Sequence, residues 1–218
     1  MIIAQRRKSR KMRPAAVLTA DIVRSTSLSA ALERQLVARL RLILSSTRFE
    51  FYRGDSFQAY TRQAADALLL SLRCRCAAIS LNRVNREPGP DIRIGLGIGN
   101  VKIAVTSPGL AKGEAFLLSG RIFETLADTG RRLAISTHDP LACEGLQVIA
   151  AYTDTIFNSL TPKQAGVIGA LLNGSSQQAV ALALRKSKST VSQHAAAAHW
   201  PEIQDLIIHF QKIIKLMS

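Results

Sequence analysis

The chain contains few cysteines, and their number and spacing exclude two classes of protein. Cys74, Cys76 and Cys143 are the only three, and an odd number argues against the disulfide framework of a small secreted domain. Their spacing matches no metal-binding motif. Because Cys74 and Cys76 alternate with arginines in a segment rich in Ala and Leu, we predict that both are buried on one side of a helix.

Long apolar runs are also missing. No segment approaches the roughly 20 apolar residues that a membrane-spanning helix needs. The basic N-terminus is not followed by the short apolar segment of a signal peptide. We therefore expect a cytoplasmic protein that does not enter a membrane.

Acidic residues are scarce relative to basic ones. The chain has 29 Lys and Arg against 15 Asp and Glu, a formal net charge of +14. Residues 1–13 contain basic residues and no acidic one, which predicts a basic disordered arm, and residues 160–218 are basic again. This distribution favours a polyanionic partner, most simply DNA. A soluble basic protein with a disordered tail is the alternative.

Hydrophobic periodicity and turn residues predict the order of the elements that follow the arm. We expect strands over 15–23, 49–52, 57–61, 91–99 and 131–136, with a further hairpin strand over 101–105. Helices are expected over 28–45, 63–84 and 113–126. This order predicts an α+β fold of the ferredoxin-like, split βαβ type, with an antiparallel sheet and helices on one of its faces.

The composition becomes predominantly helical near residue 141. We place an α+β domain over residues 14–140, a helical linker over 141–159 and a helix-turn-helix domain over 160–218. Thr161 followed by Pro162 predicts the first helix start of the last domain.

Residues 178–194 have helix-turn-helix spacing. Ala181 is small where two helices must cross closely, and Ser187 is placed to cap the second, recognition helix. Arg185 lies near the turn, where glycine is usual. The predicted DNA contacts are Arg185, Lys186, Lys188, Ser189, Thr190, Ser192 and Gln193. The alternative is a protein-binding three-helix module whose alanines at 195–198 pack on a partner.

Two aspartates each lie at the end of an apolar segment predicted to be a strand. Asp21 lies near the end of the first strand, and Asp55 lies in the Gly54-Asp55 turn of the hairpin. If that strand pairs with the hairpin, the two carboxylates come together, and a cation must offset their repulsion. Mg²⁺ or Mn²⁺ with a phosphate ligand would do so. The alternative is that Asp21 caps a helix and Asp55 stabilises the turn.

The strand predicted over 91–99 alternates apolar residues with Arg93 and three glycines. A strand face without side chains predicts that another part of the chain approaches its backbone closely. The spacing of these glycines, and the lack of a helix directly after them, do not fit a dinucleotide-binding fingerprint.

Four segments occur in the order seen in class III adenylyl and guanylyl cyclase domains: 20–29, 53–57, 92–99 and 113–121. With the helices that follow, the chain resembles the SatD-like family, in which a cyclase-type domain precedes a helix-turn-helix. Residues 54–58 and 160–164 are similar to signatures of that family.

The resemblance implies roles for individual residues. Asp21 and Asp55 match the two metal ligands of the cyclases, with the Ile22 carbonyl oxygen as a further ligand. Arg121 matches the arginine that stabilises the pentavalent phosphorus. These four residues form the part of a cyclase site that holds metal and phosphate.

Two positions depart from the cyclases. Leu117 stands where the cyclases have a ribose-orienting asparagine, and Phe51 where they have a purine-selecting Lys or Glu. We therefore predict a homodimeric DNA-binding regulator whose degenerate cyclase-like domain senses a nucleotide. One alternative is an active Mg- or Mn-dependent nucleotidyl cyclase or a related triphosphate-processing enzyme. Another is a scaffold whose two domains only mediate assembly.

Overall fold

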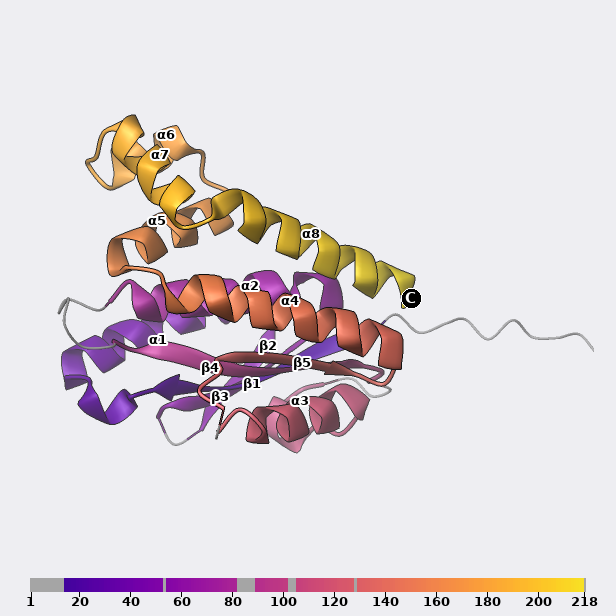
Figure 1. The fold of residues 1–218 in the computed structure, drawn as a ribbon. Coiled ribbons are helices and arrows are strands. Elements are labelled where there is room, and N and C mark those ends of the chain that lie inside the picture. Colours follow the sequence, from indigo (N-terminus) through magenta and orange to yellow (C-terminus); the bar gives the residue numbers. More distant parts are fainter. Residues whose placement is uncertain (1–13, 53, 82–88, 102–104, 128, 218) are drawn as a thin grey trace, which may run out of the picture.

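The computed structural model describes residues 14–52, 54–81, 89–101, 105–127 and 129–217. The arm predicted over 1–13 lies outside the described residues, as do positions 102–104 of the hairpin strand predicted over 101–105. The described part forms a mixed α+β structure with a five-stranded sheet and a further helical layer (Figure 1). None of its helices is both long and apolar enough to span a membrane.

The sheet has the strand order β2-β3-β1-β4-β5. Its strands are β1 Ala15–Val23, β2 Arg48–Tyr52, β3 Ser56–Thr61, β4 Asp91–Gly99 and β5 Leu133–Thr137. The pairs β2·β3, β1·β3 and β1·β4 are antiparallel. β5 runs parallel to β4, so the prediction of an antiparallel sheet is wrong at this pair. The intervening helix α3 (Glu114–Glu124) makes a crossover, which allows β5 to run in the same direction as β4.

Helices lie on both faces of the sheet, which corrects the prediction that they cover one face. The large core on one face includes residues of α1 (Ala30–Leu44), α2 (Ala67–Ile79) and α4 (Pro140–Asn158). α3 lies on the other face (Figure 1). Short 3-10 helices occupy the connections at Ser25–Ser27, Ala64–Asp66 and Pro108–Leu110. The segment predicted as a helical linker is thus α4, which packs along β5.

The glycines of β4 explain why α3 lies on this second face. A Cβ atom at Gly95 would lie 2.6 Å from the Ser119 carbonyl oxygen, and one at Gly97 would lie 3.0 Å from the Ser119 Cα. Because side chains are missing there, the backbone of α3 approaches the sheet closely, as predicted from the glycine alternation. On the opposite face, β4 is apolar and buried through Ile92, Ile94, Leu96 and Ile98.

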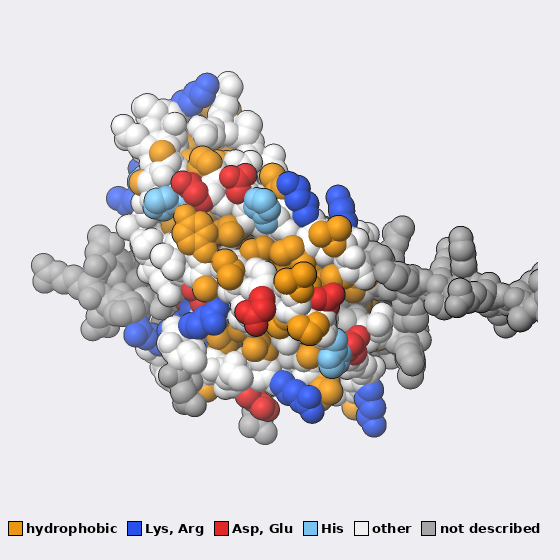
Figure 2. Space-filling view, turned by 45° about the vertical axis from the view of Figure 1, so that its right-hand side comes forward, with side chains coloured by type: hydrophobic (Ala, Val, Ile, Leu, Met, Phe, Trp, Pro, Cys, Tyr) orange, Lys and Arg blue, Asp and Glu red, His pale blue; other side chains and the backbone are white. Residues whose placement is uncertain are grey.

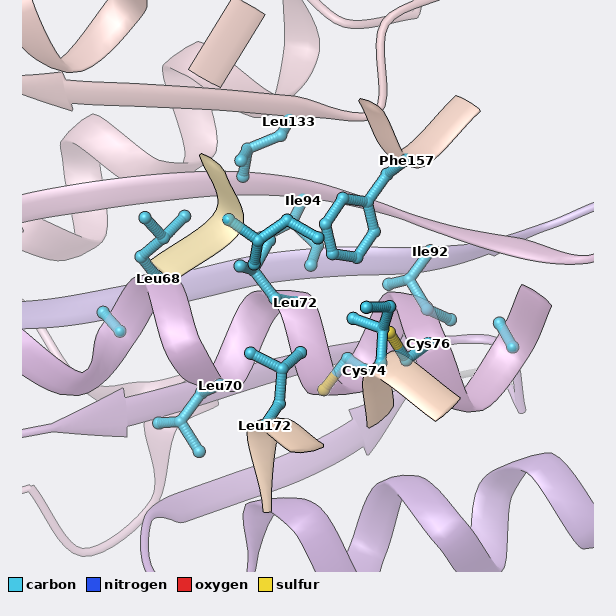
Figure 3. Close-up of a cluster of buried hydrophobic side chains, with 14 of the residues drawn as sticks. Leu68, Leu70, Leu72, Cys74, Cys76, Ile92, Ile94, Leu133, Phe157 and Leu172 are labelled. Atoms are coloured by element: carbon cyan, nitrogen blue, oxygen red, sulfur yellow. The ribbon is translucent and has the colours of Figure 1, made fainter. Parts of the chain in front are cut away.

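α2 lies in the middle of the molecule and is buried along most of its length. Figure 3 shows its Leu68 and Leu72 near Ile94 of β4, Leu133 of β5 and Phe157 of α4. Cys74 and Cys76 are both buried, as predicted. Burial raises the pKa of the Cys74 thiol to about 12 and also raises that of Cys76. Neither thiol is therefore set up for reactivity.

Four helices form the C-terminal layer: α5 Pro162–Leu172, α6 Gln177–Ala183, α7 Lys188–Ala197 and α8 Trp200–Leu216. Thr161 and Gln164 form a capping box at the start of α5, which confirms the predicted helix start. α5 packs against α2, and α8 packs against α4 (Figure 1). The C-terminal layer therefore packs on the helices of the α+β part through its first helix, α5, and its last helix, α8.

Candidate functional site

The pairing of β1 with β3 brings the two predicted metal-ligand aspartates together. Asp21 lies opposite Ser56 in this register, and the Ile22 N–H donates to the Asp55 carbonyl oxygen at 2.8 Å. The Asp55 carboxylate accepts hydrogen bonds from the Ser25 hydroxyl at 2.8 Å and the Ser56 hydroxyl at 3.3 Å. The prediction that strand pairing makes the two aspartates neighbours is confirmed for their backbones.

Arg93 is the cation beside Asp21, and sequence reasoning did not assign it this role. The two residues are partners in the β1·β4 register. Arg93 donates from Nε to Asp21 Oδ1 at 3.1 Å and from Nη2 to Oδ2. Its guanidinium also lies 5.1 Å from the centroid of the Phe123 ring on α3. The available signal in the sequence was the single arginine on the glycine face of this strand.

This ion pair bears on the predicted Mg²⁺ or Mn²⁺ site. Divalent ions such as Mg²⁺ bind carboxylate oxygens, and each oxygen of Asp21 already accepts one hydrogen bond from Arg93. Among the described residues, no group of three or more His, Cys, Asp or Glu side chains is arranged to hold a metal ion. The metal site predicted at Asp21, Ile22 and Asp55 therefore stays a prediction, in which a divalent ion would compete with Arg93 for the Asp21 carboxylate.

The other residues compared with the cyclases are either exposed or packed in the core, away from Asp21. The Arg121 side chain is exposed on α3 and forms no hydrogen bond or ion pair with another described residue. Leu117, one turn earlier, is 50% exposed. The Phe51 ring packs against the large core, 5.2 Å from the Phe57 ring and 4.8 Å from the Arg41 guanidinium. Phe51 thus packs on the sheet face opposite α3, whereas Asp21 and Arg93 lie on the α3 face.

A polar cluster around Glu50 of β2 was also missed by sequence reasoning. Its carboxylate accepts from the Ser107 hydroxyl at 2.6 Å, the Gly109 N–H at 3.3 Å and the Tyr52 hydroxyl at 3.3 Å. The hydrogen bond from Ser107 is the main cause of the lowered pKa of Glu50. Burial, with the nearby charge of Glu50, raises the pKa of Tyr52 to about 12. The cluster ties the segment before α3 to the edge of the sheet.

The connection between α6 and α7 spans residues 184–187 and has the features expected of the predicted turn. The Ser187 hydroxyl accepts from the Thr190 N–H at 3.1 Å and caps α7. Arg185 has a left-handed backbone conformation, with φ of 51°. Glycine adopts this conformation most readily. The left-handed backbone therefore explains why glycine is usual at the position that Arg185 holds in this turn. Ala181 and Val191 are buried where the two helices pack.

The predicted DNA contacts lie together at this turn and along α7. Thr190 is partly buried, and the others are exposed: Arg185, Lys186, Lys188, Ser189, Ser192 and Gln193. The Ser187 hydroxyl lies 2.8 Å from the hydroxyls of both Ser189 and Thr190. These two side chains therefore take part in the cap, which leaves Arg185, the two lysines, Ser192 and Gln193 as the groups most available to a partner.

Comparison with protein-family models and with curated proteins finds no match to this chain. The resemblance to the SatD-like family and to class III cyclases therefore stays a prediction from the motifs. Function has to be argued from the geometry and charge of the site itself.

Proposed function

We propose that the protein is a DNA-binding regulator in which α6 and α7 form a helix-turn-helix and α7 is the recognition helix. One observation carries this proposal: the exposed side of the turn and of α7 presents Arg185, Lys186 and Lys188 beside short polar side chains. Residues 160–201 contain no acidic residue. Cations bind phosphates, and hydroxyl and amide groups hydrogen-bond to base edges, so the surface suits a duplex.

The burial of the alanines after His194 argues against the protein-binding alternative. Ala195 and Ala198 are buried in the protein's own core, at 2% and 0% exposure. Ala196 and Ala197 are the exposed pair in this run. A continuous alanine surface for a partner protein is therefore not presented, whereas the cationic side of the helix is.

We propose a homodimer, because a single domain of this type usually binds DNA as a dimer. Exposed apolar side chains on two neighbouring helices favour self-association: Val148 (68% exposed) and Tyr152 (44%) on α4, and Ile208 (45%) on α8. On the face shown in Figure 2, apolar side chains gather in a band across the middle of the molecule. A second copy would remove part of this apolar surface from water.

Replacing Lys186 and Lys188 with alanine together is expected to weaken DNA binding and to reduce its dependence on salt. Two lost phosphate contacts lower the slope of log K against log salt concentration by about 1.8. The slope is measured by fluorescence anisotropy with a mixed-sequence duplex over a series of salt concentrations. The matched control replaces Lys212 and Lys215 of α8, which changes the net charge equally. Equal losses in both double variants would remove α7 from the interface.

The α+β part is proposed to be a degenerate class III cyclase-like domain. The order β1-α1-β2-β3-α2-β4 along the chain supports a ferredoxin-like arrangement, and the neighbouring Asp21 and Asp55 support the cyclase resemblance. The Asp21–Arg93 ion pair and the apolar Leu117 and Phe51 argue against turnover. We therefore place regulation, rather than catalysis, in this domain, with the cyclase or triphosphate-processing enzyme as the alternative.

Incubating the purified protein with ATP or GTP and either Mg²⁺ or Mn²⁺ is expected to yield no cyclic nucleotide above the level of an Asp55→Ala control. The reason is that Arg93 is paired with the Asp21 carboxylate, and that apolar Leu117 and Phe51 stand at positions where the cyclases have polar side chains. Product is measured by chromatography of the reaction mixture. A cyclic nucleotide formed by the natural chain and abolished by Asp55→Ala would establish the enzyme alternative.

A further inference from the structure

A cleft of about 560 Å³ lies between the first two helices of the α+β part and the C-terminal helical layer, beside the contact of α2 with α5. α1 and α2 form one wall, and α5, the turn before α7 and one residue of α7 form the other. Cavities that hold small organic ligands have volumes of about 300–1,000 Å³. The cleft is thus large enough for a small organic molecule.

The charged side chains of this cleft are all basic. Arg39 and Arg73 line one wall, and Lys163 and Lys186 line the other, with His194 nearby. Of the described residues that line the cleft, none is acidic. Four cations drawn from four different segments around one cavity create a positive potential that favours an anionic ligand.

Most of these cations keep donors for a ligand. Arg73 donates from Nε and Nη2 to the Leu172 carbonyl oxygen at 3.0 and 2.7 Å, and Arg39 donates from Nη1 to the Ser80 hydroxyl at 3.3 Å. These bonds hold the two guanidiniums in place and leave other N–H groups of each unused. The side-chain ammonium groups of Lys163 and Lys186 form no hydrogen bond or ion pair with another described residue.

The rest of the lining is largely apolar. Leu42 of α1 is 76% exposed and Leu184 of the turn is 42% exposed, and both line the cleft with Ile43 and Val167. Exposed leucines on facing walls are unfavourable in water unless a ligand or partner covers them. An occupant therefore needs an apolar or planar part as well as negative charge.

We infer that this cleft binds a small organic phosphate of nucleotide size. The phosphates lie among Arg39, Arg73, Lys163 and Lys186, and the apolar part covers the leucines. This site differs from the ion pair of Asp21 with Arg93, which lies on the α3 face of the sheet. It also uses Lys186, which the proposed function assigns to DNA.

A ligand in the cleft therefore opposes DNA binding, and this second step rests on the proposed function. One Lys186 ammonium group cannot pair fully with a ligand phosphate and a DNA phosphate at once. Linkage then requires that each ligand weakens the binding of the other by the same factor. The turn before α7 lines the cleft together with α1 and α2. An occupant therefore contacts both the α+β part and the C-terminal helical layer.

The experiment uses ATP carrying a fluorescent N-methylanthraniloyl group, in buffer with EDTA so that no divalent metal contributes. As the protein is added, the anisotropy of the labelled ATP is expected to rise to a plateau, and unlabelled ATP should reverse the rise by competition. Adenosine lacks the phosphates and pyrophosphate lacks the planar base, so each should compete more weakly. Arg39→Glu and Lys163→Glu are each expected to weaken binding about tenfold or more, since each removes a charge-assisted contact and adds repulsion.

Two controls separate this site from other basic surfaces. Arg34→Glu makes the same charge change on the exposed side of α1 outside the cleft, and it should bind ATP nearly as the natural chain does. Lys212→Glu makes the same charge change on the exposed side of α8, also outside the cleft, and should likewise leave binding nearly unchanged. Thermal unfolding of each variant confirms that it is folded. Absence of saturable binding, or equal losses for Arg34→Glu and both cleft variants, would overturn the inference.

The coupling is tested by measuring DNA affinity with and without saturating ATP in EDTA. ATP is expected to weaken DNA binding by the natural chain and to have little effect on Arg39→Glu, which controls for ionic strength. Bound ATP that leaves DNA affinity unchanged would overturn the coupling. If the chain binds no DNA without ATP, the proposed function fails, whereas the nucleotide titration still decides the occupancy of the cleft.

Discussion

Replacing Arg75 with methionine is expected to destabilise the protein by about 3–5 kcal/mol, the typical loss when one partner of a buried ion pair is removed. Arg75 is 0% exposed. Its guanidinium donates to Asp91 at 3.1 and 2.7 Å, to Asp154 at 2.6 Å and to Asn158 at 2.9 Å. Without the guanidinium, two poorly solvated carboxylates remain, and only Asp154 keeps another cation, Arg131, whose Nε lies 3.8 Å from Oδ2.

The position of this network explains why the loss should be global. Asp154 of α4 also accepts from the N–H groups of Arg132 and Leu133 at 2.9 and 3.1 Å, where β5 begins. Burial by itself lowers the pKa of Arg75, but the charges and hydrogen bonds of Asp91 and Asp154 outweigh it and leave the pKa raised. Arg75 therefore stays charged and joins α2, β4 and α4.

Urea denaturation followed by circular dichroism measures the change. The control is Arg34→Met, an arginine exposed on α1, for which the expected change is within about 0.5 kcal/mol. Arg75→Lys should recover only part of the stability, because an ammonium group cannot make the bidentate contact with Asp91. A loss below about 1 kcal/mol for Arg75→Met would contradict the role assigned to the network.

Adding one methyl group at Gly97 is expected to destabilise the protein by about 1–3 kcal/mol, the range for overpacking a tight contact. In Gly97→Ala, the new Cβ would lie 3.0 Å from the Ser119 Cα and still closer to the Ala115 carbonyl oxygen and the Ser119 nitrogen. These neighbours are backbone atoms, so no side chain can rotate away. The whole of α3 would have to move from the sheet.

Gly120→Ala is the matched control for this prediction. Gly120 lies within α3, and a Cβ atom there meets nothing within 4 Å. The same chemical change should therefore stabilise the protein by about 0.5–1 kcal/mol through helix propensity. Thermal unfolding midpoints of the two variants should shift in opposite directions. If both variants melt higher than the natural chain, the close approach of α3 to β4 does not limit stability.

The elements that the sequence predicted best depend on local patterns. The first strand follows from a short apolar run, the α1 helix from a helical repeat and the glycine-rich β4 from alternation, each within its own segment. The caps at Thr161 and Ser187 follow from a hydroxyl beside the first turn of a helix. Asp21 and Asp55 were predicted as neighbours because one strand pairing was enough to join them.

The predictions that failed or were missing depend on contacts between distant segments. The parallel pairing of β5 depends on the route of the chain through α3, and Arg93 became a partner of Asp21 through the register of β1 with β4. The Arg75 network combines residues of α2, β4 and α4. No periodicity within one segment indicates which carboxylate, among several, such an arginine meets.

By itself the sequence determined the basic character of the chain, most of the helices and strands and the positions of the caps, because these properties depend on neighbouring residues. Only the tertiary structure decided which groups meet. It paired Asp21 with an arginine and placed α3 against glycines. It also arranged cations from four segments around one cleft. The physical reason is that ion pairing and cavity shape depend on distances in space, which strand register and helix packing set after the local elements have formed.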